Sequence, residues 1–124
     1  MCEAIEELFT KMTNGTPLRL EFVCLGTQRN LLDNWEENIL RIGQEVLTNA
    51  LRHAQATFFR AKITFAPTEV SLDFRDDGCG FTVGTKNNGF GLQGIKERIE
   101  SMNGQLTVES AKGGGTGIKI VLPT

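Results

Sequence analysis

The chain lacks the features that mark several large classes of protein. Its 124 residues contain no apolar run that approaches the roughly 20 residues of a membrane span, and its first residues show no signal-peptide pattern. One histidine and the absence of a C-x-x-C motif argue against a zinc site. The formal net charge is −2 and there is no basic run, so we expect no direct nucleic-acid partner.

Cysteine is also sparse. The three cysteines, Cys2, Cys24 and Cys79, are odd in number and irregularly spaced. Such usage favours free thiols in a reducing compartment over a disulfide framework. We therefore expect a cytoplasmic chain that is not embedded in a membrane, although a full-length protein is free to carry a membrane anchor.

What is present fits one soluble globular domain over residues 1–124, since 40% of the residues are hydrophobic and 23% are charged. Helical spacing and strand-like alternation follow one another along the chain. The predicted helices are 3–12, 35–54 and 92–102, and the predicted strands are 18–24, 61–65, 70–74, 106–108 and 118–122. Strands that arrive in pairs predict hairpins. We therefore expect an α+β fold, a two-layer α/β sandwich whose mixed, mostly antiparallel sheet carries its helices on one face.

Residues 89–94 (GFGLQG) match G-x-G-x-x-G, the fingerprint of dinucleotide-binding turns. In that fold the first glycine follows a strand directly. Here the preceding strand ends near Arg75, about 14 residues earlier. Although Glu109 lies near the position of the expected ribose-binding acid, the strand–turn–helix context is missing, and we predict no NAD site.

The helix predicted over residues 35–54 carries a polar face. At about 100° per residue, Glu45, Asn49, Arg52 and His53 share a face roughly 100° wide. The carboxylate and amide oxygens suit Mg²⁺, and the cationic side chains suit phosphate oxygens. Glu45 is also able to act as a base. By itself, this pattern is more typical of a solvated helix surface.

Two glycine clusters add to this polar face. Asp76 follows a predicted strand and precedes Gly78 and Gly80, so a flat ring has room against the backbone while the acid accepts from an exocyclic amine such as that of adenine. The alternative is an ordinary Asx turn. Residues 113–117 (GGGTG) precede the last strand and place the Thr116 hydroxyl beside glycines; they also read as a flexible hairpin loop.

Together and in this order, the motifs resemble the GHKL, or Bergerat-fold, ATP-binding superfamily. The matches are E-x-x-x-N-x-x-R-H from Glu45 to His53 with the N box, D-x-G-x-G from Asp76 to Gly80 with the G1 box, G-x-G-L from Gly89 to Leu92 with the G2 box, and Gly115-Thr116-Gly117 with the last glycine motif. The chain is most similar to the catalytic domains of two-component sensor histidine kinases. Among these it looks most like the subgroup whose response regulators carry helix-turn-helix output domains.

The resemblance implies ATP and Mg²⁺ as ligands. It implies Asn49 and Glu45 as the Mg²⁺ side of the site, with Glu45 as the catalytic acid or base, and it puts Arg52 and His53 near the phosphates. The acid at position 76 would bind the adenine amine.

Further ligand contacts follow from the same resemblance. Thr116 would help to fix adenine, and the backbone at Gly78, Gly80, Gly89, Gly91 and Leu92 would line the nucleotide. Residues 81–88 would form a lid, and the helix that starts after it would offer N–H groups to the phosphates.

The chain also departs from the family pattern. Family kinases transfer the γ-phosphoryl to a histidine on a dimerisation domain, and no such motif is present. We therefore expect that domain to be a separate partner and a response regulator to be engaged through the full-length kinase. Asp77 stands where asparagine is frequent and is expected to weaken ATP binding modestly. A regulatory nucleotide-binding module and a serine kinase or ATPase of the same superfamily remain alternatives.

Overall fold

The computed structural model describes residues 2–29, 31, 35–52, 56–78, 92–110 and 115–124. Within these ranges, three helices and five strands follow in the predicted order. They are α1 (Cys2–Thr13), β1 (Arg19–Gly26), α2 (Trp35–Arg52), β2 (Phe58–Phe65), β3 (Glu69–Asp76), α3 (Leu92–Ser101), β4 (Gln105–Ser110) and β5 (Thr116–Pro123). Among the described helices, none is long and apolar enough to cross a membrane.

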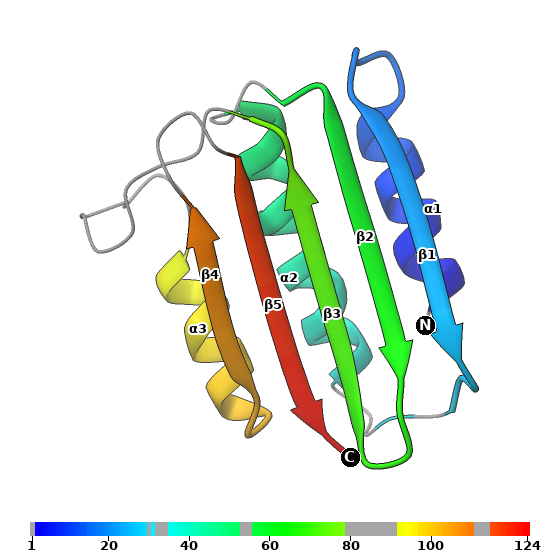
Figure 1. Ribbon diagram of the computed structural model, residues 1–124, viewed down its shortest axis with the longest axis vertical. Coiled ribbons are helices and arrows are strands. Elements are labelled where there is room, and N and C mark those ends of the chain that lie inside the picture. Colours follow the sequence, from blue (N-terminus) through cyan, green and yellow to red (C-terminus); the bar gives the residue numbers. More distant parts are fainter. Residues whose placement is uncertain (1, 30, 32–34, 53–55, 79–91, 111–114) are drawn as a thin grey trace.

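The strands form one sheet in the order β1-β2-β3-β5-β4. β1 and β2 are parallel, because α2 connects them, and the other three neighbouring pairs are antiparallel. All three helices cover the same face of this sheet (Figure 1). The predicted two-layer sandwich with a mixed, mostly antiparallel sheet is therefore confirmed.

The core fills the space between the two layers. β2 and β3 bury every second residue, as the period of two along a strand requires when one face is covered. Three aromatic rings meet at its centre: Phe9 of α1 lies edge-on to Phe59 and Phe74, at centroid distances of 5.7 and 6.0 Å. The long helix α2 packs on the sheet through Ile39 and Ile42, both fully buried.

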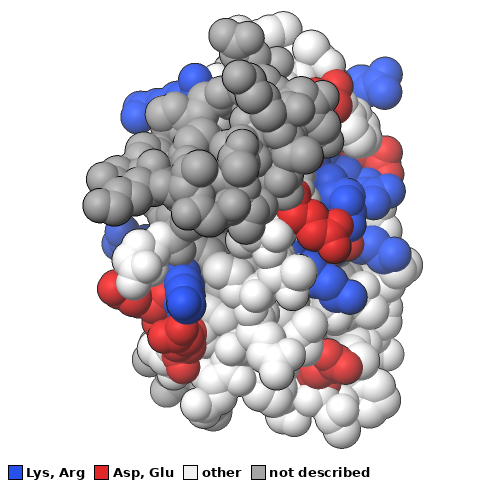
Figure 2. Space-filling model, turned by 60° about the vertical axis from the view of Figure 1, so that its left-hand side comes forward, with Lys and Arg blue, Asp and Glu red and all other residues white. Residues whose placement is uncertain are grey.

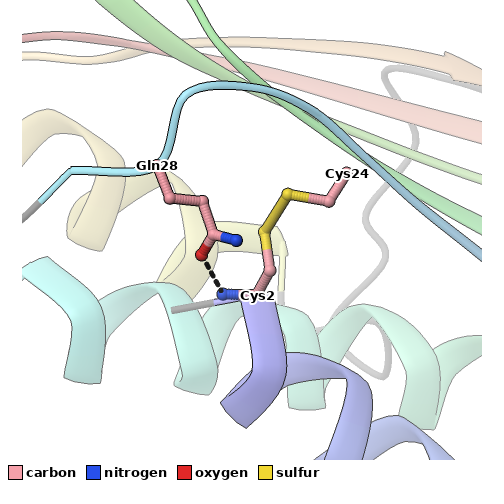
Figure 3. The surroundings of a disulfide bond; sticks show 3 residues. All are labelled: Cys2, Cys24 and Gln28. Atoms are coloured by element: carbon pink, nitrogen blue, oxygen red, sulfur yellow. Dashed lines mark hydrogen bonds between the residues drawn. A yellow bond between two sulfur atoms is a disulfide. The ribbon is translucent and has the colours of Figure 1, made fainter.

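The expectation of free thiols is wrong for one pair of cysteines. A disulfide joins Cys2, at the start of α1, to Cys24 in β1 (Figure 3). The strand β1 runs back alongside α1, so its last residues return to the start of the helix (Figure 1). The two Cα atoms lie 6.7 Å apart, although 22 positions separate the residues in sequence. Cysteine usage therefore gives no argument for a reducing compartment.

We expect Cys24→Ser to lower the free energy of unfolding by about 3 kcal/mol under non-reducing conditions, because the bond closes a loop of 22 residues in the unfolded chain. Urea unfolding followed by circular dichroism measures the change. A reductant should bring the wild-type chain to the stability of the variant. Equal midpoints for the two proteins without reductant would contradict the bond.

Candidate functional site

The polar face of α2 is present as predicted over the described part of the helix. Glu45 and Asn49 are half-buried and lie about 40° apart around the axis, one turn from each other, and Arg52 is exposed. The opposite face of α2 is buried against the sheet, through residues that include Val46 and Ala50. The polar side chains therefore border the core at the C-terminal half of α2.

Asp76 is the last residue of β3, and it lies between two neighbouring strands. It pairs with Phe59 of β2 on one side and with Thr116 of β5 on the other. Because β3 buries every second residue from Val70 to Phe74, the same alternation turns the Asp76 side chain toward the helix layer. Its carboxylate therefore points to the side of the sheet on which α2 lies.

The Asp76 carboxylate is half-buried and already accepts hydrogen bonds. Its Oδ1 accepts from the backbone N–H of Gly78 at 2.8 Å. Burial raises the pKa of Asp76; hydrogen bonds from the backbone of Gly78 and Thr116 oppose this rise, and the charge of Asp77 adds to it. A desolvated carboxylate with remaining acceptor capacity suits a donor that arrives from a ligand.

Gly115 lies directly against the backbone that carries this carboxylate. Its φ is +78°, in the region that glycine adopts without strain. A Cβ atom built at this position would collide with the carbonyl oxygen of Asp76. The glycine of the last motif thus lets the start of β5 approach the end of β3, with Thr116 next to it.

The end of α2, the end of β3 and the start of β5 lie at the same end of the molecule, the upper end in Figure 1. The backbone N–H of Ala56 donates to the carbonyl oxygen of Ala50 at 3.5 Å, which keeps the chain close to the helix as it turns into β2. That strand then pairs with β3 beside Asp76. The structure therefore brings together Asp76, Gly78 and Thr116 and sets them at the end of the fold where α2 finishes.

The helix α3 points its start toward this same end. Arg98, late in α3, donates from Nη1 to Oδ1 of Asn38, early in α2, at 3.1 Å, and the two helices run in opposite directions (Figure 1). The first residue of α3 is Leu92, as predicted. A helix N-terminus presents N–H groups without intrahelical acceptors, which suits an anion.

Several predicted site residues lie outside the described residues. They are His53, Gly80, Gly89, Gly91 and the lid segment 81–88.

The donor set at α2 fits a magnesium ion shared with phosphate groups. Within the described part of the chain, no three His, Cys, Asp or Glu side chains group closely enough to hold a metal by themselves. Glu45 and Asn49 offer two oxygen donors on a half-buried surface. Mg²⁺ is commonly bound by one or two protein oxygens, with substrate phosphates and water completing the shell.

The outer face of the sheet carries charges of both signs. Across three adjacent strands, Lys62, Asp73 and Lys119 stand in register. Arg75 forms ion pairs with Asp73 and with Glu109, at 3.4 and 3.7 Å. Figure 2 likewise shows basic and acidic side chains side by side on the described surface. Basic and acidic side chains therefore alternate on this surface, which is not a basic patch.

Comparison with known proteins identifies the family. Residues 36–124 match the model of the histidine kinase-, DNA gyrase B-, and HSP90-like ATPases. The chain belongs to this family. The matched region contains all four of the glycine and asparagine motifs that were found by sequence.

Among curated relatives of this ATPase domain is the signal transduction histidine-protein kinase/phosphatase DegS of Bacillus subtilis (strain 168). It is 32% identical over 122 residues, which cover 94% of this chain and 32% of DegS. Sensor histidine kinase YxjM of the same organism is 42% identical over 90 residues, covering 73% of this chain and 22% of YxjM. The chain thus spans a third or less of the length of these relatives.

The fold is shared with solved histidine kinase structures. The histidine kinase domain of the blue-light activated histidine kinase from Erythrobacter litoralis EL346 matches with a TM-score of 0.74 at 19% identity. The match covers 98% of this chain and 58% of that one. At this identity the likeness establishes the fold of the ATPase domain alone.

Sequence patterns missed one part of the site. The Asp77 carboxylate accepts hydrogen bonds from Thr57 and from the backbone of Phe58. The sequence indicates only an extra negative charge at Asp77, and this charge contributes to the raised pKa of Asp76. Thr57 belongs to no recognised motif, so only the pairing of β2 with β3 reveals the contact.

Proposed function

We propose that this chain is the catalytic, ATP-binding domain of a sensor histidine kinase in a two-component system. The observation that carries the proposal is the placement of Asp76 and Thr116 side by side, at the end of the fold where the polar face of α2 finishes. The carboxylate turns toward the helix layer, so an adenine ring held by it would direct its phosphates toward α2 and α3. Membership of an ATPase family supports ATP as the nucleotide.

In the proposed complex, the Asp76 carboxylate accepts a hydrogen bond from the adenine amine, and Thr116 helps to fix the ring. Gly78 and Gly80 let the ring approach the backbone. The motif residues Gly89, Gly91 and Leu92 are assigned to the phosphates, together with the N–H groups at the start of α3.

Asn49 and Glu45 would hold Mg²⁺ from α2, while Arg52 and His53 would neutralise phosphate charge. When bound, the ion would neutralise charge on the β- and γ-phosphates. Glu45 would take the proton from the second ring nitrogen of the acceptor imidazole, while the lone pair of the attacking nitrogen forms the new P–N bond and ADP leaves. The other residues of the site would position the nucleotide, since phosphoryl transfer requires mainly positioning and charge neutralisation.

The partners in this proposal are a dimerisation domain that carries the phosphoacceptor histidine and a response regulator reached through the full-length kinase. His53 lies in the motif of the polar α2 face, so it is assigned to the ligand and not to the acceptor role. A cytoplasmic location follows from the substrate, because ATP is supplied inside the cell. Residues 1–124 would act as one catalytic domain of the longer kinase.

We expect Asp76→Asn to weaken ATP binding by about 1–3 kcal/mol, the scale of a lost charge-assisted hydrogen bond, and to remove the preference for ATP over GTP. Isothermal titration with each nucleotide and Mg²⁺ measures both effects. Asp73→Asn is the matched control, because it removes the same charge from the same strand on the opposite face. An unaltered ATP preference in Asp76→Asn would refute the adenine assignment.

Transfer itself is tested by mixing the chain with an acceptor domain and γ-labelled ATP. Label on a histidine, which is lost in acid and stable in base, supports the kinase. Label on serine, or release of phosphate alone, would favour the serine kinase or ATPase alternative. ATP binding without either product would favour the regulatory module.

A further inference from the structure

The residue after Asp76 makes contacts that its position in a turn does not require. Oδ1 of Asp77 accepts from the backbone N–H of Thr57 and from that of Phe58, both at 2.8 Å. Oδ2 accepts from the Thr57 hydroxyl at 2.5 Å. The backbone N–H of Asp77 donates in turn to the carbonyl oxygen of Phe58 at 3.3 Å. Three hydrogen bonds to the exposed Asp77 side chain and one from its backbone therefore make up the contact.

These bonds are tertiary and differ from those of an Asx turn. In an Asx turn the side chain accepts from the backbone two residues ahead. Asp76 does this with Gly78, whereas Asp77 reaches back 20 positions to Thr57. The two consecutive aspartates therefore differ in their contacts. Asp76 forms the turn with Gly78, and Asp77 binds the segment that begins β2.

The contact links the segment that follows α2 to the end of β3, which carries Asp76. Thr57 lies just before β2, on the chain that has left α2 and its polar face. The ladder between β2 and β3 ends with the pair Phe59 and Asp76, and beyond it the Asp77 carboxylate adds to the backbone hydrogen bond that Asp77 donates to Phe58. Thr57 is itself fixed to β1, because its carbonyl oxygen accepts from the backbone N–H of Arg19 at 2.9 Å. The chain after β3 is thus bonded to the start of β2, which is itself bonded to β1.

We propose that Asp77 is a positioning residue for the adenine acceptor: its carboxylate holds the end of β3 on the start of β2 and so fixes the direction of the Asp76 side chain. The neighbours of Asp77 explain why the effect is local. Asp76 precedes it and Gly78, which donates to Asp76, follows it, so both ends of that hydrogen bond depend on where residue 77 is held.

The electrostatics fit this role. A second carboxylate next to the acceptor is unfavourable for an ionised Asp76, and its charge does raise the pKa of Asp76. The donors around Asp77 compensate, led by the Thr57 hydroxyl and the N–H of Phe58, and they hold the pKa of Asp77 below its ordinary value. The negative charge of Asp77 is thus tolerated because its hydrogen-bond donors stabilise it.

The substitution Asp77→Asn separates the effect of hydrogen bonding from that of charge. The amide oxygen of the new side chain can accept from both N–H groups that Oδ1 now serves, and its amide nitrogen can donate to the Thr57 hydroxyl. Alanine removes every side-chain bond. Thr57→Val removes only the hydroxyl donor and leaves the backbone bonds intact.

The first readout needs no nucleotide. In ¹H–¹⁵N spectra of the chain alone, Asp77→Ala should shift the Gly78 amide signal and speed its hydrogen exchange, because its acceptor is no longer held. Asp77→Asn should keep both near wild type, and Thr57→Val should fall between. An unchanged Gly78 amide in a folded Asp77→Ala variant would overturn the proposal, as would an Asn variant that behaves like the Ala variant.

The second readout rests on the proposed function. Asp77→Ala should weaken Mg·ATP binding about tenfold and reduce the preference for ATP over GTP, as expected when one directed hydrogen bond is lost. Asp77→Asn should bind at least as tightly as wild type, since it also removes the charge next to Asp76. In an Asp76→Asn background, Asp77→Ala should have no further effect on ATP affinity.

The two failures are distinguishable. If Asp76→Asn costs selectivity but Asp77→Ala does not, the positioning role is wrong and the adenine assignment stands. Additive losses in the double variant would also overturn the positioning role, because Asp77 would then act independently of Asp76. If the Gly78 amide responds as expected while Asp76→Asn leaves nucleotide selectivity unchanged, the contact is real and the proposed function is wrong.

Discussion

Asn49→Ala is expected to weaken Mg²⁺-dependent ATP binding by on the order of 100-fold, while binding without the ion changes little. Even residues that only orient metal ligands cost about 10–100-fold in metal affinity when they are replaced, so loss of a ligand should reach the top of that range. The helix should tolerate the change, since alanine has the higher helix propensity and the position is only half-buried. Calorimetric titration with ATP, with and without Mg²⁺, measures the difference.

Thr48→Ala is the matched control for Asn49. Thr48 precedes it in α2 and is equally half-buried, but its hydroxyl donates within the helix, to the carbonyl oxygen of Gln44 at 2.7 Å. This variant should bind Mg·ATP as the wild type does. Equal Mg·ATP affinity in Asn49→Ala and wild type would mean that α2 does not hold the ion.

Gly115→Ala is expected to reduce phosphoryl transfer by on the order of 100-fold, the cost of displacing a binding group by about 1 Å. An alanine there would adopt φ near +78°, at about 1–2 kcal/mol of strain, and its Cβ would collide with the Asp76 carbonyl oxygen. The ends of β3 and β5 must then separate, which moves the proposed adenine acceptor. Initial transfer rates and thermal unfolding test both consequences.

Gly117→Ala provides the comparison within the same motif. Its Cβ would lie 3.1 Å from Nη1 of Arg75, the end of a flexible side chain that can move aside. We expect a change in stability of less than about 1 kcal/mol and near-normal ATP binding, because replacing glycine by alanine within a strand is mild. If both glycines tolerate alanine equally, the close approach of Gly115 to the Asp76 backbone is not needed for function.

The elements of the fold could be predicted because each has a clear period. Helical spacing in residues 35–54 found α2, and alternation found β2 and β3 together with their hairpin. The strand β2 begins earlier than predicted. It starts at Phe58, in the apolar pair Phe58-Phe59, where no polar residue marks the alternation. The parallel pairing of β1 with β2 needs α2 as a crossover, and local patterns do not report strand order.

The candidate site was only partly predictable, for a similar reason. Asp76 and Thr116 could be named because their glycine neighbours form recognisable motifs, and the structure pairs them across two strands. The contact between Asp77 and Thr57 and the Cys2–Cys24 disulfide could not be inferred, because each joins residues about 20 positions apart whose adjacency depends on strand pairing and helix packing. The number and spacing of the cysteines predicted free thiols for this reason.

The most direct test is a crystal structure of the chain with Mg²⁺ and a non-hydrolysable ATP analogue. The adenine amine should lie within hydrogen-bonding distance of the Asp76 carboxylate, and the ion should contact the Asn49 side chain. A nucleotide seated elsewhere, for example in the groove between α1 and α2 that Leu8, Leu40 and Arg41 help to line, would contradict the account.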